Sequence, residues 1–151
     1  MHLKSTREFL GYIEECHIAL IELYKRLSVE SNDDKVRLLL YFLENKEQLS
    51  YQYIHNYIQQ APHHILETWI DNIFDKSFPL RCQQLRLQAN ISIDDVIGLA
   101  MTFDSQLIEL LQDSAYKSPT AECQQALQNI TTQEQQTLHQ VIMARNEFEY
   151  M

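Results

Sequence analysis

The chain has 151 residues and a mass of 17.9 kDa, enough for one domain with a sizeable buried core. Its two Gly and three Pro are too few for the many turns of a β-sandwich or barrel, so the composition favours an all-α fold. The net charge of −9, without a Lys/Arg cluster, excludes the electrostatic surface of a nucleic-acid-binding protein.

Residues 5–61 predict a helical hairpin. A Ser-Thr-Arg-Glu capping box at 5–8 indicates the start of the first helix, and the second is expected to begin near residues 31–34 and to end at Pro62. Apolar residues recur every three or four positions, which places them on one inward face of each helix. These residues are Phe9, Ile13, Leu20, Tyr24 and Leu27 in the first helix, and Val36, Leu39, Leu43 and Ile54 in the second.

Residues 62–91 predict a long crossover within the same domain. We expect a helical stretch near Ile65 to Phe74, and burial of the aromatic side chains of Trp69, Phe74 and Phe78. Helices of about 25 residues span roughly 37 Å, so a connection that runs along the bundle needs this length.

Residues 92–148 predict a second hairpin. Ser92 to Asp95 form a weaker capping box, and the partner helix is expected to begin near Ser118-Pro119-Thr120. The inward residues are Val96, Ala100, Leu107 and Leu111, followed by Ala126, Ile130 and Val141. The whole chain, 1–151, then forms a single up-down four-helix bundle with a long crossover between two hairpins.

The two hairpins are related by an internal repeat at an offset of 87 residues. Gly11 corresponds to Gly98, Ser5 to Ser92, and the Leu-Ile-Glu-Leu sequence at 20–23 recurs at 107–110. The register continues without a gap from residue 5 to residue 60, across the connection between helices. Such self-similarity indicates two copies of one supersecondary unit.

The paired hairpins, with Ser-Ile-Asp-Asp-Val-Ile-Gly-Leu-Ala-Met opening the second at 92–101, resemble the rubrerythrin-like branch of the ferritin-like superfamily. The resemblance covers nearly the whole chain and rests on spacing. It implies that the first and third helices each supply a Glu, and the second and fourth each supply a Glu-x-x-His. Six such side chains would hold two iron or manganese ions inside the bundle.

Carried over position by position, this ligand set is incomplete. His17 and Asp104 stand where the resemblance implies the first-helix and third-helix Glu, while Glu47 and Glu134 match the Glu of the two Glu-x-x-His motifs. The two His positions are occupied by Ser50 and Thr137. The resemblance therefore implies a degenerate di-metal site, with Ser50, Thr137 and Tyr24 next to the four candidate ligands.

Spacing from the residues alone places the same four side chains inside the bundle. His17 lies four residues after Ile13, Asp104 four after Ala100, Glu47 four after Leu43, and Glu134 four after Ile130. Residues four apart share a helix face, so a polar belt is expected near mid-height of the apolar interior.

Three readings of this belt remain open. The carboxyl groups can be partly protonated and hydrogen-bonded to Ser50, Thr137, Tyr24 and water in a vestigial network. Alternatively, His17, Glu47, Asp104 and Glu134 can hold one Fe, Mn or Zn ion, which accepts a His with carboxylates. The third reading is a two-metal redox centre, for which both expected histidine ligands are missing.

We expect a non-catalytic binding or interaction role, with a protein or small ligand as the unidentified partner. The alternative is a metal-binding oxidoreductase with a remodelled mono- or dinuclear centre; enzyme activity is left undecided. Tyr41, Tyr51, Tyr53 and Tyr57 lie on the second helix at mixed phases; some of them are expected in the core, and the remainder favour a homodimer interface. The sequence shows no signal peptide and no apolar run of membrane-spanning length, and its three Cys form no Cys-x-x-Cys. We therefore expect a cytoplasmic protein that contacts neither membrane nor nucleic acid.

Overall fold

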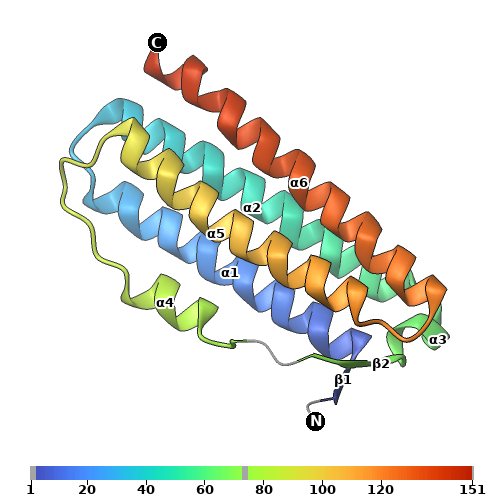
Figure 1. Ribbon diagram of the computed structural model, residues 1–151. Coiled ribbons are helices and arrows are strands. Elements are labelled where there is room, and N and C mark those ends of the chain that lie inside the picture. Colours follow the sequence, from blue (N-terminus) through green and yellow to red (C-terminus); the bar gives the residue numbers. More distant parts are fainter. Residues whose placement is uncertain (1–2, 73–74, 151) are drawn as a thin grey trace.

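The computed structural model describes residues 3–72 and 75–150 and contains four long helices. They are α1 (Thr6–Glu30), α2 (Asp34–Gln60), α5 (Ile93–Tyr116) and α6 (Ala121–Glu149). The four helices run side by side along a common axis, with the connection between α2 and α5 on the outside of the bundle (Figure 1). This architecture confirms the predicted all-α four-helix bundle.

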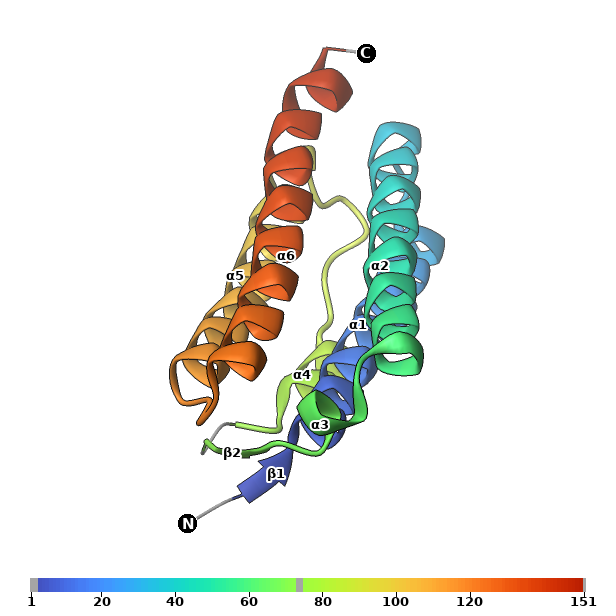
Figure 2. The same ribbon diagram turned by 90° about the vertical axis from the view of Figure 1, so that its right-hand side faces the viewer.

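The bundle consists of two helical hairpins that face each other. α1 packs chiefly on α2, and α5 packs chiefly on α6. Figure 2 shows the two pairs on opposite sides, joined by the long connection that runs the length of the bundle. The interior between the pairs therefore receives one stripe of side chains from each long helix.

The helix starts repeat at the offset seen in the sequence. α1 begins at Thr6 and α5 at Ile93, while α2 begins at Asp34 and α6 at Ala121, so each pair is 87 residues apart. The preceding residues all cap their helices through a side-chain oxygen, as expected for Ser, Thr and Asp. These caps are Ser5, Asp33, Ser92 and Thr120.

The two capping boxes differ in how complete their hydrogen bonds are, and the order is the reverse of the prediction. Ser92 and Asp95 make the complete reciprocal pair, each side chain accepting a hydrogen bond from the other's backbone amide at 3.0 Å. In the first helix the Ser5 hydroxyl accepts from the Glu8 amide, but the Glu8 carboxylate accepts from the Ser5 hydroxyl. Ser5 also belongs to strand β1, so its backbone is committed to the sheet. The box expected to be weaker is therefore the complete one.

The crossover contains α3 (His63–Leu66), β2 (Trp69–Asp71) and α4 (Phe78–Gln84). β2 pairs antiparallel with β1 (Leu3–Ser5), with Lys4 opposite Ile70. The predicted helix from Ile65 to Phe74 was wrong beyond Leu66, and Phe74 lies outside the described residues. The Thr68 carbonyl accepts hydrogen bonds from the Thr6 amide at 2.8 Å and the Thr6 hydroxyl at 2.9 Å. These tertiary bonds hold the chain extended where local pattern favoured a helix.

Burial confirms the predicted inward stripes of all four long helices. In the crossover, Phe78 is buried against Phe103 with ring centroids 5.1 Å apart. Trp69 is 54% exposed, which corrects the expectation that it would be buried. Side chains alternate along a strand, and β2 turns Ile70 inward and Trp69 outward. Within residues 3–72 and 75–150, no helix is long and apolar enough to cross a membrane.

Candidate functional site: a buried histidine between carboxylates

Four polar side chains enter the apolar interior, one from each long helix. His17 comes from α1, Glu47 from α2, Asp104 from α5 and Glu134 from α6, and none is more than 7% exposed. Each follows an apolar core residue by four positions, so helical geometry alone turns it inward. His17 and Asp104 are 87 residues apart, as are Glu47 and Glu134, so the repeat supplies the polar positions in pairs.

His17 bridges two of the carboxylates. Its Nδ1 lies 2.5 Å from Glu47 Oε2, and its Nε2 lies 2.7 Å from Glu134 Oε1. Both contacts have the short length of charge-assisted hydrogen bonds. The imidazole therefore joins α2 to α6 through α1, across the two hairpins.

A bridge between two ionised carboxylates requires a proton on both ring nitrogens of His17. An ionised carboxylate can only accept hydrogen bonds, so each ring nitrogen facing one must donate. Burial alone would lower the pKa of His17, but the charges of Glu134 and Glu47, together with their hydrogen bonds, outweigh it. The pKa of His17 is therefore raised well above 6.5. At neutral pH the residue is an imidazolium, and it supplies the positive charge of the site.

For Asp104, in contrast to His17, the surroundings favour the neutral form. Burial, followed by the negative charges of Glu47 and Glu134, raises its pKa well above 3.8, and His17 offsets this only in part. A protonated Asp104 can donate to Glu47, a hydrogen bond that raises the pKa further. The burial and charges around the cluster thus favour the charged form of His17 and the neutral form of Asp104.

Ser50, Thr137 and Tyr24, which were expected next to the four candidate ligands, differ in their burial and hydrogen bonding. Ser50 is buried one turn after Glu47. Thr137 donates its hydroxyl to the Gln133 carbonyl at 3.1 Å, within its own helix. Tyr24 is 1% exposed, and its hydroxyl is the one buried side-chain oxygen or nitrogen of the described chain that has no hydrogen-bond partner. Burial, then the neighbouring carboxyl groups of Asp104 and Glu47, raise the pKa of this phenol well above 10.0.

This donor set does not fit the two-metal centre that the resemblance implies. Two ligands of one metal ion, each at about 2.0–2.2 Å, lie more than about 3 Å apart, whereas His17 contacts its carboxylates at 2.5 and 2.7 Å. A metal-bound imidazole also needs one deprotonated nitrogen, and both are engaged here. Across residues 3–72 and 75–150, no group of three or more His, Cys, Asp or Glu side chains is arranged to hold a metal ion.

One pair of lysines, Lys4 and Lys76, was not identified from the sequence. Lys4 and Lys76 are far apart in the sequence, yet both line a cavity of about 570 Å³ on the outer side of α1. The pairing of β1 with β2 brings their two segments to the same end of the bundle. No local motif contains both residues, so only the long-range strand pairing could have revealed them.

Comparison with solved structures identifies the fold. The chain superposes on a protein from Thermotoga maritima, provisionally described as a ferritin-like diiron-carboxylate protein, with a TM-score of 0.62 and 15% sequence identity. The match covers 97% of this chain and 98% of the other. No family model and no curated protein matches the sequence. The fold is therefore ferritin-like, as the paired hairpins predicted.

Proposed function

We propose that this protein is a rubrerythrin-like member of the ferritin-like superfamily with a degenerate site, and that it has a non-catalytic binding or interaction role. One observation carries the proposal: both ring nitrogens of His17 are taken up by Glu47 and Glu134. In this proposal the imidazolium supplies the positive charge that metal ions would supply among the same carboxylates.

The donor chemistry around His17 supports this proposal. The positions implied for two further imidazole ligands carry Ser50 and Thr137, whose hydroxyls are weak ligands for iron or manganese. With a buried cation already present, a divalent ion entering the cluster must displace a proton and break two short hydrogen bonds. We therefore propose that metal binding is weak and that the cluster acts as a structural tie between the hairpins.

Elemental analysis of protein purified without chelator tests the proposal. We expect less than stoichiometric Fe, Mn and Zn, and histidine ¹⁵N resonances in which both nitrogens of His17 carry protons at neutral pH. Near-stoichiometric metal that disappears in a Glu47→Ala, Glu134→Ala variant would contradict it. That outcome would support the alternative, a metal-binding oxidoreductase with a remodelled centre.

A reconstruction variant tests whether the site is degenerate. His17→Glu, Ser50→His, Asp104→Glu and Thr137→His together restore the donor set that the resemblance implies. We expect this variant to bind about two Fe²⁺ or Mn²⁺ per chain, as di-metal bundles do. The matched control keeps His17 and Asp104 and changes only Ser50→His and Thr137→His. If the folded four-site variant binds no more metal than this control, the positional correspondence is wrong.

We also propose that the protein forms a cytoplasmic homodimer through the outer face of α2. Leu38, Tyr41 and Leu49 are 46%, 59% and 66% exposed and share this face with Asn45 and Gln52. The face carries no charged residue at these positions, although the chain has a net charge of −9. Two acidic copies can therefore approach here without placing like charges in contact.

Sedimentation equilibrium tests the dimer. Tyr41→Lys and Leu49→Lys together would place like charges across the interface, and we expect a monomer. The matched control is Val29→Lys, at an 85% exposed apolar residue near the end of α1, which should leave the dimer intact. A wild-type monomer, or a dimer that survives both α2 substitutions, would contradict the proposal.

A further inference from the structure

The only two glycines of the chain occupy corresponding positions in the second turn of two long helices. Gly11 lies in α1 and Gly98 in α5, 87 residues apart. A glycine inside a helix destabilises it relative to Ala, because it loses more conformational freedom on folding. A Cβ atom added at either position would meet nothing within 4 Å, so the packing of this chain does not require glycine there.

Each glycine lies at the floor of an open groove, and the two grooves are related by the repeat. The cavity over Gly11 has a volume of about 570 Å³ and that over Gly98 about 630 Å³. Five lining positions of one recur 87 residues later in the other. These pairs are Lys4 and Ile91, Glu8 and Asp95, Gly11 and Gly98, Tyr12 and Leu99, and Glu15 and Thr102. The fold thus produces the groove twice, and of these two grooves the one over Gly11 is lined by lysines.

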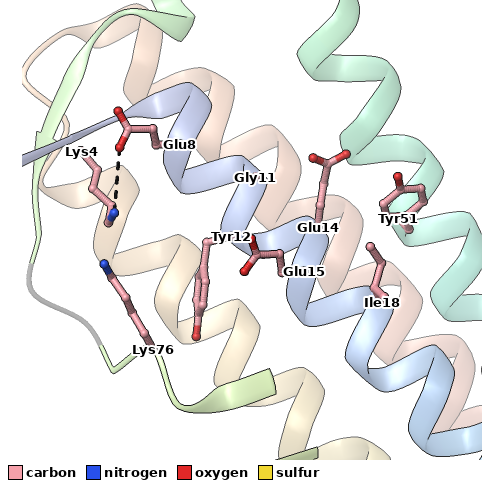
Figure 3. Close-up of a pocket in the computed structure, with 9 residues that line it drawn as sticks. All are labelled: Lys4, Glu8, Gly11, Tyr12, Glu14, Glu15, Ile18, Tyr51 and Lys76. Atoms are coloured by element: carbon pink, nitrogen blue, oxygen red, sulfur yellow. Dashed lines mark ion pairs between the residues drawn. The ribbon is translucent and has the colours of Figure 1, made fainter. Parts of the chain in front are cut away.

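Two lysines converge at one end of the Gly11 groove. In Figure 3 the ammonium groups of Lys4 and Lys76 point toward each other beside Glu8 and the Tyr12 ring. Glu8 forms an ion pair with Lys4 at 3.9 Å, while no carboxylate in the described part of the chain lies within ion-pair distance of Lys76. Contact with Lys4 lowers the pKa of Lys76, as expected for two neighbouring like charges. An anionic group between them would relieve this repulsion.

The other end of the groove is acidic. Glu14 lies farther along α1 near the Tyr51 ring, and Glu15 lies beside Tyr12 on the side away from the lysines (Figure 3). Glu14 is paired with His55 at 2.9 Å, whereas Glu15 is exposed and has no ion-pair partner within residues 3–72 and 75–150. From Glu8 to Glu15 the helix rises about 10 Å. The lysine pair, with Glu8 beside it, and Glu15 therefore lie on opposite sides of the Tyr12 ring in the groove (Figure 3).

From this arrangement we infer that the groove over Gly11 binds a small zwitterion. Its carboxylate sits between Lys4 and Lys76, its ammonium group faces Glu15, and its aliphatic part lies over Gly11. A simple anion would be repelled by the nearby glutamates, and a simple cation by the lysines. The missing Cβ of Gly11 lets the ligand approach the helix backbone closely.

Backbone NMR provides a readout with an internal control. Two glycines give two diagnostic amide resonances, one in each groove. The probes are ω-amino acids of increasing length, from glycine to 6-aminohexanoate, with hexanoate and hexylamine as singly charged controls. We expect saturable shifts of the Gly11 resonance, with dissociation constants of about 1 mM for the best length, while Gly98 stays fixed. The singly charged probes should bind at least about tenfold more weakly.

Matched variants separate binding from folding. Gly11→Leu fills the proposed site and Gly98→Leu fills its counterpart, and both should fold because a Cβ fits at each position. We expect only Gly11→Leu to abolish binding, and Lys76→Gln and Glu15→Gln each to weaken it about tenfold, the loss of one ion pair of about 1.4 kcal/mol. Equal effects of the two glycine variants would overturn the proposal. So would hexanoate binding as well as the zwitterion, or a Gly11 resonance that stays fixed at tens of millimolar of every probe.

Discussion

Replacing His17 with Leu removes the only cation that contacts Glu47 and Glu134 in the described interior. Both carboxyl groups remain buried, at 4% and 7% exposure; Glu134 loses the hydrogen bond from His17, and Glu47 keeps only the one from Asp104. Leu has a comparable volume, so the variant changes charge far more than it changes packing. We expect the free energy of unfolding at pH 7 to fall by about 3–5 kcal/mol, the cost of leaving a buried charge without its partner.

The size of this effect follows from opposing terms. At an effective dielectric constant of about 20, two charges about 4 Å apart attract by about 4 kcal/mol, and His17 makes two such contacts. Burying each of the three ionised groups costs several kcal/mol, so the intact cluster contributes little net stability. Removing the imidazolium deletes the attraction and leaves the burial cost of both carboxylates. The loss on substitution is therefore large although the net contribution of the cluster is small.

Urea denaturation followed by far-ultraviolet circular dichroism measures the change. The control variant is His139→Leu, at an exposed histidine of α6, which should alter stability by less than about 0.5 kcal/mol. A triple variant, His17→Leu with Glu47→Met and Glu134→Met, removes the charges as well and should recover most of the lost stability. A His17→Leu variant as stable as the control, or a triple variant as unstable as the single one, would contradict the electrostatic role of His17.

Three further outcomes are expected. Because the pKa of His17 is raised above 6.5, the folded state keeps a proton that the unfolded chain releases, so stability should fall as pH rises above 6.5; an increase would contradict this. Asp104→Asn should stabilise the protein by about 1 kcal/mol or more at pH 7, where the unfolded Asp is ionised, and by almost nothing near pH 4, as thermal unfolding at both pH values would show. Ser92→Ala should cost about 1 kcal/mol in urea denaturation, since it removes a complete capping box.

The helical framework was predictable because its determinants are local. The offset of 87 residues relates the starts of α1 and α5 and those of α2 and α6. Helical periodicity then turned His17, Glu47, Asp104 and Glu134 inward, which the burial of all four confirms. For these side chains to converge, the four helices needed only to pack side by side with the polar residues at similar heights along the bundle. The metal-binding role of these residues stays a prediction.

The strand pair and the contacts of His17 lie beyond this kind of reasoning. β1 and β2 are three residues long and pair across more than sixty positions, so neither shows a strand pattern of its own. Periodicity placed His17 in the belt, but it could not say which atoms each ring nitrogen would meet. The contacts of the ring nitrogens depend on differences of a few tenths of an ångström in side-chain position. For the same reason, the hydroxyl of Tyr24 could not be foreseen to lack a partner.

The difference between the two halves of the repeat has an electrostatic reason. At the position that recurs after 87 residues, one hairpin carries His17 and the other Asp104. Two aspartates there would give four buried carboxyl groups without a cation, and two histidines would place two imidazoliums side by side. One histidine and one protonated aspartate leave a single buried cation between Glu47 and Glu134. If the carboxylates are held without metal ions, as we propose, this asymmetry between His17 and Asp104 supplies the single cation that they need.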